Sequence, residues 1–308
     1  MLRSAEGERL DRVLSGLFPV RSRAFLQRCI RERRVTVNEK YRRPADAVHQ
    51  GDHIRIAWPP PKRIRLVPEE IPLAVLAEDD DILVINKSPG LVVHPNDAYS
   101  GGTLVHALLH HDPDSFRELV DANLRPGIVH RLDKDTSGAM VVAKHLDARR
   151  FLKDAFKERN VEKTYLTIVI GEFGAVTGTI RGPIGRHPRR RTKMAVLPES
   201  GKRAVTHYRV LGQGNGVSLL EVRIETGRTH QIRIHFANVD HPVLGDALYG
   251  GKQKDLAFRV KRQMLHAWKL AIPHPRTGKM TEYMAPPPAD FCTALRELGL
   301  PVIGEELP

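Results

Sequence analysis

The chain contains the segment Gly127-Ile128-Val129-His130-Arg131-Leu132-Asp133-Lys134-Asp135-Thr136-Ser137-Gly138. This segment places two carboxylates, an arginine and a histidine between a short apolar run and a predicted strand at 140–143. Such a concentration of ionisable side chains is typical of a catalytic or ion-binding site. Two kinds of site can be tested on these residues alone, a calcium loop and a phosphotransferase centre.

The calcium loop fails at its last ligand. Asp133, Asp135, Ser137 and Gly138 fit the first half of an EF-hand loop, but the twelfth position, which needs a bidentate acid, is Lys144.

A phosphoaspartyl phosphotransferase of the haloacid dehalogenase type fits poorly, but it stays open as the rival enzyme and would require magnesium. Its nucleophilic aspartate normally ends an apolar strand, whereas His130 and Arg131 directly precede Asp133 here. The nearest acidic cluster, 79–81, also lies upstream rather than downstream.

The string HRLDKDTSG at 130–138 resembles the signature of pseudouridine synthases of the RluA/RluD type, and three further stretches resemble that family's other motifs in the same order. They are 81–87 with 90–95, Lys163-Thr164-Tyr165, and 226–235 followed by His241-Pro242 and Gly245-Asp246. The resemblance implies an RNA-modifying isomerase that needs no cofactor and no metal. The absence of a phosphate-binding glycine loop, a Gly-x-Ser-x-Gly elbow and a His-Glu-x-x-His pair agrees with that implication.

The resemblance assigns roles to four residues. Asp133 would be the essential carboxylate, Tyr165 would stack on the freed base, and Arg233 would pair with Asp133. Arg131 would fill the gap left in the RNA when the target uridine is flipped out. A guanidinium beside Asp133 would favour the ionised carboxylate, as a nucleophile or base requires. His130 and Asp135 are interpreted as structural.

We expect the stretch that contains Arg131 and Asp133 and the stretch 231–235 to be strands. In that case Arg131 and Asp133 share one face, and Gln231, Arg233 and His235 share another while the intervening isoleucines pack behind.

The first sixty residues predict a separate basic module of two helices, the second capped by Ser22, and strands at 35–37 and 53–56. They hold thirteen Lys or Arg against seven Asp or Glu, a net charge of +6. The module resembles the small S4-like RNA-binding domain, although Glu39 stands where that family usually has glycine after the asparagine. We expect its arginines to bind the RNA backbone: Arg21, Arg23, Arg28, Arg31, Arg33 and Arg34.

A linker at 61–72, a catalytic domain at 73–292 and a C-terminal tail at 293–308 complete the predicted organisation. Strands predominate in the catalytic domain, including 82–85, 140–143 and 220–224, with helices at 103–110 and about 147–157. We therefore expect an α+β fold: a small S4-like α/β module followed by a domain built on a mostly antiparallel mixed sheet with flanking helices.

The charge of the whole chain favours a polyanionic partner. The 308 residues carry a net charge of +13, which indicates RNA. No apolar run is long enough to span a membrane, and Cys29 and Cys292 are too few for a disulfide scaffold. We expect a cytoplasmic protein, acting as a monomer. A histidine pair at 106 and 110 lacks supporting ligands, so no metal site is predicted.

A basic run at residues 186–193, between predicted strands, indicates a loop that contacts RNA. With the stretches 194–196 and 204–208, it resembles the large-subunit rRNA synthase D subgroup, which implies 23S rRNA as the substrate. The alternative is a non-enzymatic RNA-binding assembly factor, against which the presence of Asp133, Tyr165 and Arg233 argues. The basic residues of the run are Arg186, Arg189, Arg190, Arg191 and Lys193.

Overall fold

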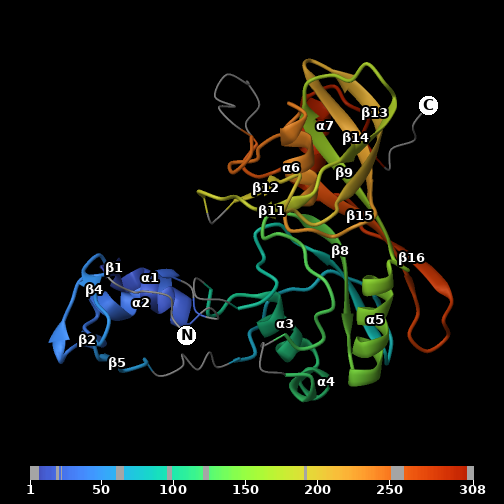
Figure 1. Ribbon diagram of the computed structural model, residues 1–308. Coiled ribbons are helices and arrows are strands. Elements are labelled where there is room, and N and C mark those ends of the chain that lie inside the picture. Colours follow the sequence, from blue (N-terminus) through green and yellow to red (C-terminus); the bar gives the residue numbers. More distant parts are fainter. Residues whose placement is uncertain are drawn as a thin grey trace. The chain divides into compact units, whose positions relative to one another are not determined.

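The computed structural model (Figure 1) describes residues 7–18, 21, 23–59, 66–95, 99–120, 125–190, 193–250 and 260–303. The chain divides into two compact units, Met1–Ile64 and Arg65–Pro308. The division falls inside the predicted linker, whose residues 61–65 lie outside the described ranges. The rest of that segment belongs to the second unit, because Leu66 packs against its core.

The first unit contains the two predicted helices and both predicted strands. A core of Leu10, Leu14, Leu26 and Val35 holds the helices on the strands. Ser22, the predicted N-cap, lies outside the described residues. The elements of the first unit are β1 (Glu8–Arg9), α1 (Leu10–Leu17), α2 (Arg23–Arg31), β2 (Val35–Val37), β3 (Lys40–Tyr41), β4 (Ala47–Val48) and β5 (Ile54–Ile56). They form two sheets, ordered β3-β2-β5 and β1-β4.

The β2–β3 turn shows how Glu39 is accommodated where glycine is usual. Asn38 and Glu39 both have positive φ, 50° and 65°, as a tight two-residue hairpin turn requires. The Asn38 side chain donates to Asp52 at 2.7 Å and accepts from the His53 amide at 2.9 Å. These bonds support a left-handed conformation that glutamate alone does not favour.

A nine-stranded sheet forms the centre of the second unit, in the order β10-β13-β14-β9-β15-β8-β7-β6, with β16 paired to β15. All its pairings are antiparallel except β15 with β8, so the predicted mostly antiparallel mixed sheet is confirmed. Its strands are β6 (Val75–Glu78), β7 (Ile82–Lys87), β8 (Ser137–Ala143), β9 (Glu162–Ile170), β10 (Thr177–Arg181), β13 (Val205–Gly214), β14 (Val217–Ile224), β15 (Leu265–Pro273) and β16 (Met280–Met284). A separate hairpin pairs β11 (Ile184–Arg186) with β12 (Met194–Val196), and the helices are α3 (Leu104–His111), α4 (Pro113–Glu118), α5 (Leu146–Glu158), α6 (Gln231–Asn238) and α7 (Ala289–Glu297).

Both faces of the sheet are covered, and the alternation of strand side chains decides which helix each residue meets. On β7, Ile82 and Val84 pack in one cluster with α5, whereas Leu83 and Ile85 pack in another with α3 and α4. Figure 1 shows α5 lying along β8. Tyr165 on β9 contacts both the α3–α4 cluster and the cluster that contains α6. The centre of this face, between those helices, is where the functional residues gather.

Two strand predictions are wrong. Residues 231–235 belong to helix α6, which follows His230 in a left-handed conformation with φ of 57°. All six residues from Gln231 to Phe236 are buried, so the polar and apolar alternation does not mark a wet and a dry face. Residues 129–136 form a loop with a turn rather than a strand.

The C-terminal segment is not a tail. Helix α7 runs past residue 292 to Glu297, and Leu295, Leu298 and Leu300 are buried in a core cluster with β9 and β14. The predicted boundary at 293 is wrong because it falls inside this helix, which begins four residues earlier. Among the described residues, no helix has the length and apolar character needed to cross a membrane.

Candidate active site

The loop at 127–138 is held in place by glycine at both ends. Gly127 and Gly138 have φ of 66° and 119°, values that other residues rarely adopt. A Cβ on Gly138 would lie 2.1 Å from the carbonyl oxygen of Ala267 on β15, so glycine alone allows this close approach. Leu132 is buried in the core beneath the loop. The loop therefore presents Asp133 from a fixed backbone.

Asp133 is paired with a buried arginine. Arg233 Nη1 donates to Asp133 Oδ2 at 2.8 Å, while its Nε and Nη2 donate to Asp246 Oδ2 and Oδ1 at 2.6 and 2.9 Å. The Arg233 side chain is only 7% exposed, that of Asp246 is fully buried, and that of Asp133 is 18% exposed. Asp246 thus orients the guanidinium, and Asp133 is the carboxylate that remains accessible.

Helix α6 is anchored to β13, which fixes the position of Arg233. The Gln231 amide donates to the Val205 carbonyl at 2.9 Å, and His235 contacts the Thr206 hydroxyl and the Gly182 carbonyl at 2.8 and 2.9 Å. Each buried polar group on this helix has a partner, as burial requires.

A histidine lies on the other side of the Asp133 carboxylate. His230 Nε2 is 3.8 Å from Asp133 Oδ1, too far for a hydrogen bond. Its Nδ1 is 2.8 Å from the Tyr249 hydroxyl, which also accepts from the Met194 amide at 2.9 Å. Because that hydroxyl accepts from Met194, its own proton is available to His230. Burial lowers the pKa of His230, and this effect outweighs the nearby charge of Asp133, which raises it. The ring is therefore neutral at pH 7.

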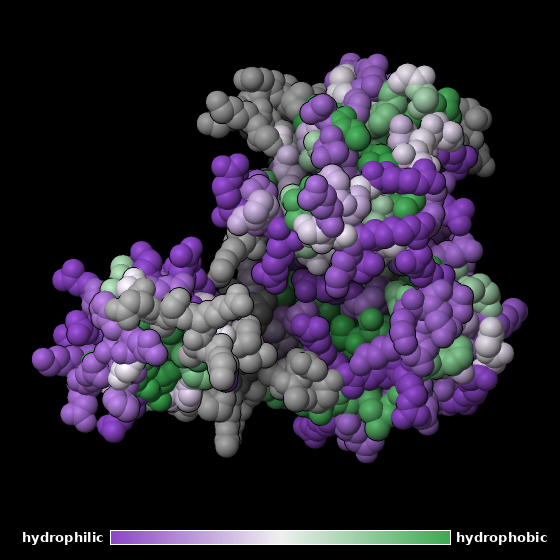
Figure 2. Space-filling model, in the orientation of Figure 1, coloured by the Kyte–Doolittle hydropathy of each residue, from purple (hydrophilic) through white to green (hydrophobic). Residues whose placement is uncertain are grey.

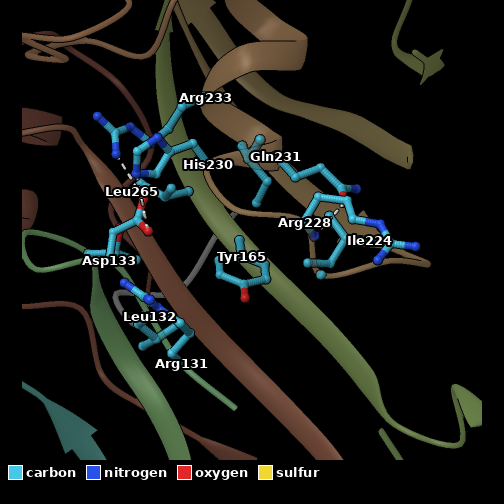
Figure 3. A pocket seen from close by; sticks show the side chains of 13 residues that line it. Arg131, Leu132, Asp133, Tyr165, Ile224, Arg228, His230, Gln231, Arg233 and Leu265 are labelled. Atoms are coloured by element: carbon cyan, nitrogen blue, oxygen red, sulfur yellow. Dashed lines mark hydrogen bonds and ion pairs between the residues drawn. The ribbon is translucent and has the colours of Figure 1, made fainter. Parts of the chain in front are cut away.

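An open pocket of about 440 Å³ lies in front of Asp133. Figure 3 shows Asp133 and Arg233 on one side of it, the Tyr165 ring in the middle and Arg228 on the far side of that ring. Burial, reinforced by the Asp133 charge, raises the pKa of Tyr165, so its phenol keeps its proton at neutral pH. The pocket offers a carboxylate held by an arginine and an aromatic face to a flat, uncharged ring.

Comparison with known proteins identifies this arrangement. Residues 81–238, about half of the chain, match the family model described as RNA pseudouridylate synthase, and residues 8–54 match the S4 domain. The chain belongs to the RNA pseudouridylate synthase family. The family resemblance and the S4-like module inferred from the sequence are confirmed, and the protein is an isomerase.

Similar proteins align with this synthase over nearly its full length. An "Uncharacterized RNA pseudouridine synthase" of Chloroflexus aurantiacus is 48% identical over 291 residues, covering 94% of this chain and 90% of that protein. A "Ribosomal large subunit pseudouridine synthase D" of Xylella fastidiosa is 43% identical over 304 residues, covering 96% and 90%. Among solved structures, "Human RNA Pseudouridylate Synthase Domain Containing 1" matches with a TM-score of 0.59 at 30% identity, covering 73% of this chain and 89% of that one.

The remaining polar residues of the loop have separate places in the synthase. Arg131 is exposed and lines the pocket next to Asp133. His130 accepts from the Val141 amide at 3.0 Å and stacks on Phe156 with ring centres 4.6 Å apart. Burial lowers the pKa of His130 to about 3, so it is a neutral structural acceptor. The predicted side-by-side arrangement of Arg131 and Asp133 is therefore reached from a loop, not a strand.

Lys87 connects the end of β7 to the catalytic loop. Its ammonium, which is fully buried, donates to the carbonyls of Ser88, Leu91 and Lys134 at 2.8, 3.0 and 2.9 Å. Burial lowers the pKa of Lys87, and the charges of Asp135 and Asp133 oppose that shift. The bond to Lys134 holds the residue directly after Asp133.

Lys87→Met is expected to lower the free energy of unfolding by about 3 kcal/mol, because three carbonyls lose their shared donor in a dry site. Urea denaturation followed by circular dichroism measures the change. Lys134→Met is the control, since that exposed side chain donates only to the Tyr99 hydroxyl. Equal midpoints for the two variants would contradict the linking role of Lys87.

Sequence reasoning did not assign His230, Asp246 or Tyr249 to the site. His230 and Asp246 belong to quoted motifs but had no role, and Tyr249 was not singled out. A signal existed for Asp246, since a buried arginine needs a carboxylate partner and this acid closely follows α6. No signal in the sequence pairs Tyr249 with His230, because that contact depends on the path of the chain after α6.

Potential metal ligands gather elsewhere in the described part of the chain. Asp79, Asp81 and His274 form a cluster, but His274 bonds Asp79 at 2.8 Å, and Arg276 and His145 bond Asp81 at 2.8 and 2.9 Å. These carboxylates already have protein partners, and Arg276 supplies a fixed positive charge to Asp81. The pair considered for zinc is split, because His106 is buried against Thr103 whereas His110 is exposed.

The predicted RNA-binding residues differ in how far they are available. Arg23 pairs with buried Asp11 at 2.7 Å, and Lys193 donates to the Leu248 carbonyl and lies over the Tyr249 ring, so both serve the fold. Arg191 lies outside the described residues. The remaining ones are exposed or half-buried on mostly hydrophilic surfaces, as Figure 2 shows for one face: Arg21, Arg28, Arg31, Arg33, Arg34, Arg186, Arg189 and Arg190.

Proposed function

We propose that this synthase converts uridine to pseudouridine in large-subunit ribosomal RNA, most specifically 23S rRNA, with Asp133 as the essential carboxylate. The observation that carries the proposal is the accessible Asp133 carboxylate, held at 2.8 Å by Arg233 and facing Tyr165 across an open pocket. The RNA class follows from the names of relatives that match more than nine-tenths of this chain.

The reaction can be balanced without an external reactant. The bond from uracil N1 to ribose C1′ breaks, the base turns, and C5 bonds to C1′. C5 then loses a proton and N1 gains one, so there is no net oxidation or reduction. Asp133, paired with Arg233, either attacks C1′ or removes a proton from the ribose.

Tyr165 and Arg131 would act on the base and on the RNA stack. The protonated phenol of Tyr165 lies where it can stack on the freed uracil and assist the departure of the C5 proton. Arg131 projects from the loop at the pocket edge, and it would replace the flipped uridine in the stack. An enzyme that acts on a base must take it out of the helix first.

Tritium release tests the proposal. Ribosomal RNA carrying tritium on uracil C5 should lose label to water when incubated with the protein and a chelator. The same RNA labelled on C6 should keep its label, because the bond between C6 and its hydrogen is not broken in the reaction. A protein that binds the RNA but releases no C5 tritium from any rRNA is not the proposed enzyme.

Charge reversal in the S4 domain should weaken RNA binding without changing the chemistry. Arg21 and Arg28 lie over the Phe25 ring at 5.4 Å, and Trp58 stacks on that ring, which gives a basic surface with aromatic platforms. Arg28→Glu with Arg31→Glu is expected to raise Kd about tenfold or more and to reduce the salt slope by about 2. Binding titrations at several salt concentrations measure both values. Arg12→Glu on α1 is the control, and a slope equal to that control would contradict the predicted binding of the RNA backbone by these arginines.

We also propose a cytoplasmic monomer with an N-terminal RNA-binding domain and a C-terminal catalytic domain. Both cysteines are unpaired, which suits a reducing compartment. Light scattering of the purified protein measures the oligomeric state.

A further inference from the structure

A second pocket, of about 670 Å³, lies beside the catalytic one, and Arg131 lines both. It is lined by four long cationic side chains: Arg125, Arg131, Arg149 and Lys153. Ile128 and Val129 add an apolar wall. Among its lining residues that the structure describes, none is acidic.

The cations come from two elements. Arg125 lies just before the loop at 127–138, and Arg131 lies within it. Arg149 and Lys153 are one turn apart on α5 and therefore share a face of that helix. Arg125, Arg131 and Lys153 are exposed. Arg149 is buried and donates to the Leu119 carbonyl at 3.4 Å.

His94 reports the positive potential of this pocket. Its Nε2 is 3.0 Å from Arg125 Nη2, so it accepts a hydrogen bond from that arginine and orients it. Burial, followed by the charges of Arg125 and Arg131, lowers the pKa of His94 to about 4. A neutral His94 leaves the arginines and Lys153 as the source of charge.

One other basic groove of the catalytic unit contains acids as well. The groove at Arg159, Lys163 and Arg223 also contains Glu162 and Glu225, and Glu162 lies 3.5 Å from Arg223. In the Arg125–Lys153 pocket, by contrast, the exposed side chains of Arg125, Arg131 and Lys153 converge, and these like charges repel each other unless an anion is bound. That arrangement is typical of a built anion site.

We propose that the Arg125–Lys153 pocket binds a phosphodiester of the substrate RNA, next to the uridine that enters the catalytic pocket. The inference rests on the proposed function, because Arg131 joins the two pockets and a continuous strand is the ligand that reaches both. Guanidinium groups match the paired oxygens of a phosphate, and Lys153 adds a point charge. The site would hold the strand in place while the neighbouring base turns.

Neutral substitutions test the site with little risk to folding. Arg125→Gln with Lys153→Gln should raise the KM for an rRNA fragment about tenfold and reduce the salt slope of binding by about 1, with kcat unchanged. Lys157→Gln, on the same helix but outside the lining of either pocket, is the matched control. Thermal melting checks that all three proteins are equally folded.

Single methylphosphonate linkages identify the ligand. An RNA with one neutral linkage beside the target uridine should bind the wild type and the Arg125/Lys153 variant equally well, because the contacted charge is already absent. If the variant matches Lys157→Gln in KM and slope, or if no single linkage removes its defect, the phosphodiester site is wrong. If the wild type forms no pseudouridine in any rRNA, the proposed function fails instead.

Discussion

Asp133→Asn is expected to abolish pseudouridine formation, lowering the rate by at least about 10³-fold, while RNA binding persists. The amide keeps the shape of the carboxylate and still accepts from Arg233, whose other two bonds go to Asp246. The protein should therefore fold as the wild type does. What is lost is the negative charge that attacks the sugar or removes its proton. Tritium release measures the rate, and a filter-binding titration measures the affinity.

Asp135→Asn is the matched control, since it removes a half-buried carboxylate from the same loop two residues away. We expect its rate to stay within a few-fold of the wild type, because this residue does not line the catalytic pocket. Removal of a negative charge near bound phosphates should leave the affinity of either variant equal or slightly higher. An Asp133→Asn protein with a tenth or more of the wild-type rate would show that another group carries the reaction.

The residues proposed to perform the chemistry could be predicted because their types, order and spacing along the chain are distinctive. Asp133, Tyr165 and Arg233 come from a loop, a strand and a helix, and the structure brings all three to one pocket. The apolar runs of β7 and β8 likewise predicted strands buried on both faces. These features depend on local pattern, which a sequence displays directly.

What remained hidden depends on tertiary contact. Gln231, Arg233 and His235 alternate with apolar residues and so predicted a strand, yet each finds a buried partner on β13, Asp246 or Gly182. A helix buried on all sides has no wet face, so its period cannot be recognised. The pairing of Arg233 with Asp246 is hidden for the same reason, since it depends on how the chain turns after α6.

Asp246→Ala is expected to destabilise the protein by about 3–5 kcal/mol, because it leaves the buried Arg233 guanidinium with Asp133 alone. Two amides, of Leu248 and Tyr249, also lose their acceptor at 2.8 and 3.0 Å. In protein that remains folded, kcat should fall about 10²-fold, since Arg233 is no longer oriented toward Asp133. Urea denaturation and tritium release measure the two effects. Glu221→Ala is the control, because it breaks an exposed pair with Arg209 and should cost about 1 kcal/mol or less.

The loss of stability should depend on pH in a defined direction. Burial alone raises the pKa of Asp246, but the bonds and charge of Arg233 bring it below its ordinary value of 3.8. The carboxylate therefore stabilises the native state fully above that value and progressively less as the pH falls through the native pKa. The difference between wild type and Asp246→Ala should be constant from pH 6 to 8 and shrink below about pH 4. Asp246→Asn keeps an acceptor but no charge, so its free energy of unfolding at pH 7 should lie between those of the wild type and Asp246→Ala. If both variants were as stable as the wild type, Asp246 would not support the pair of Asp133 and Arg233.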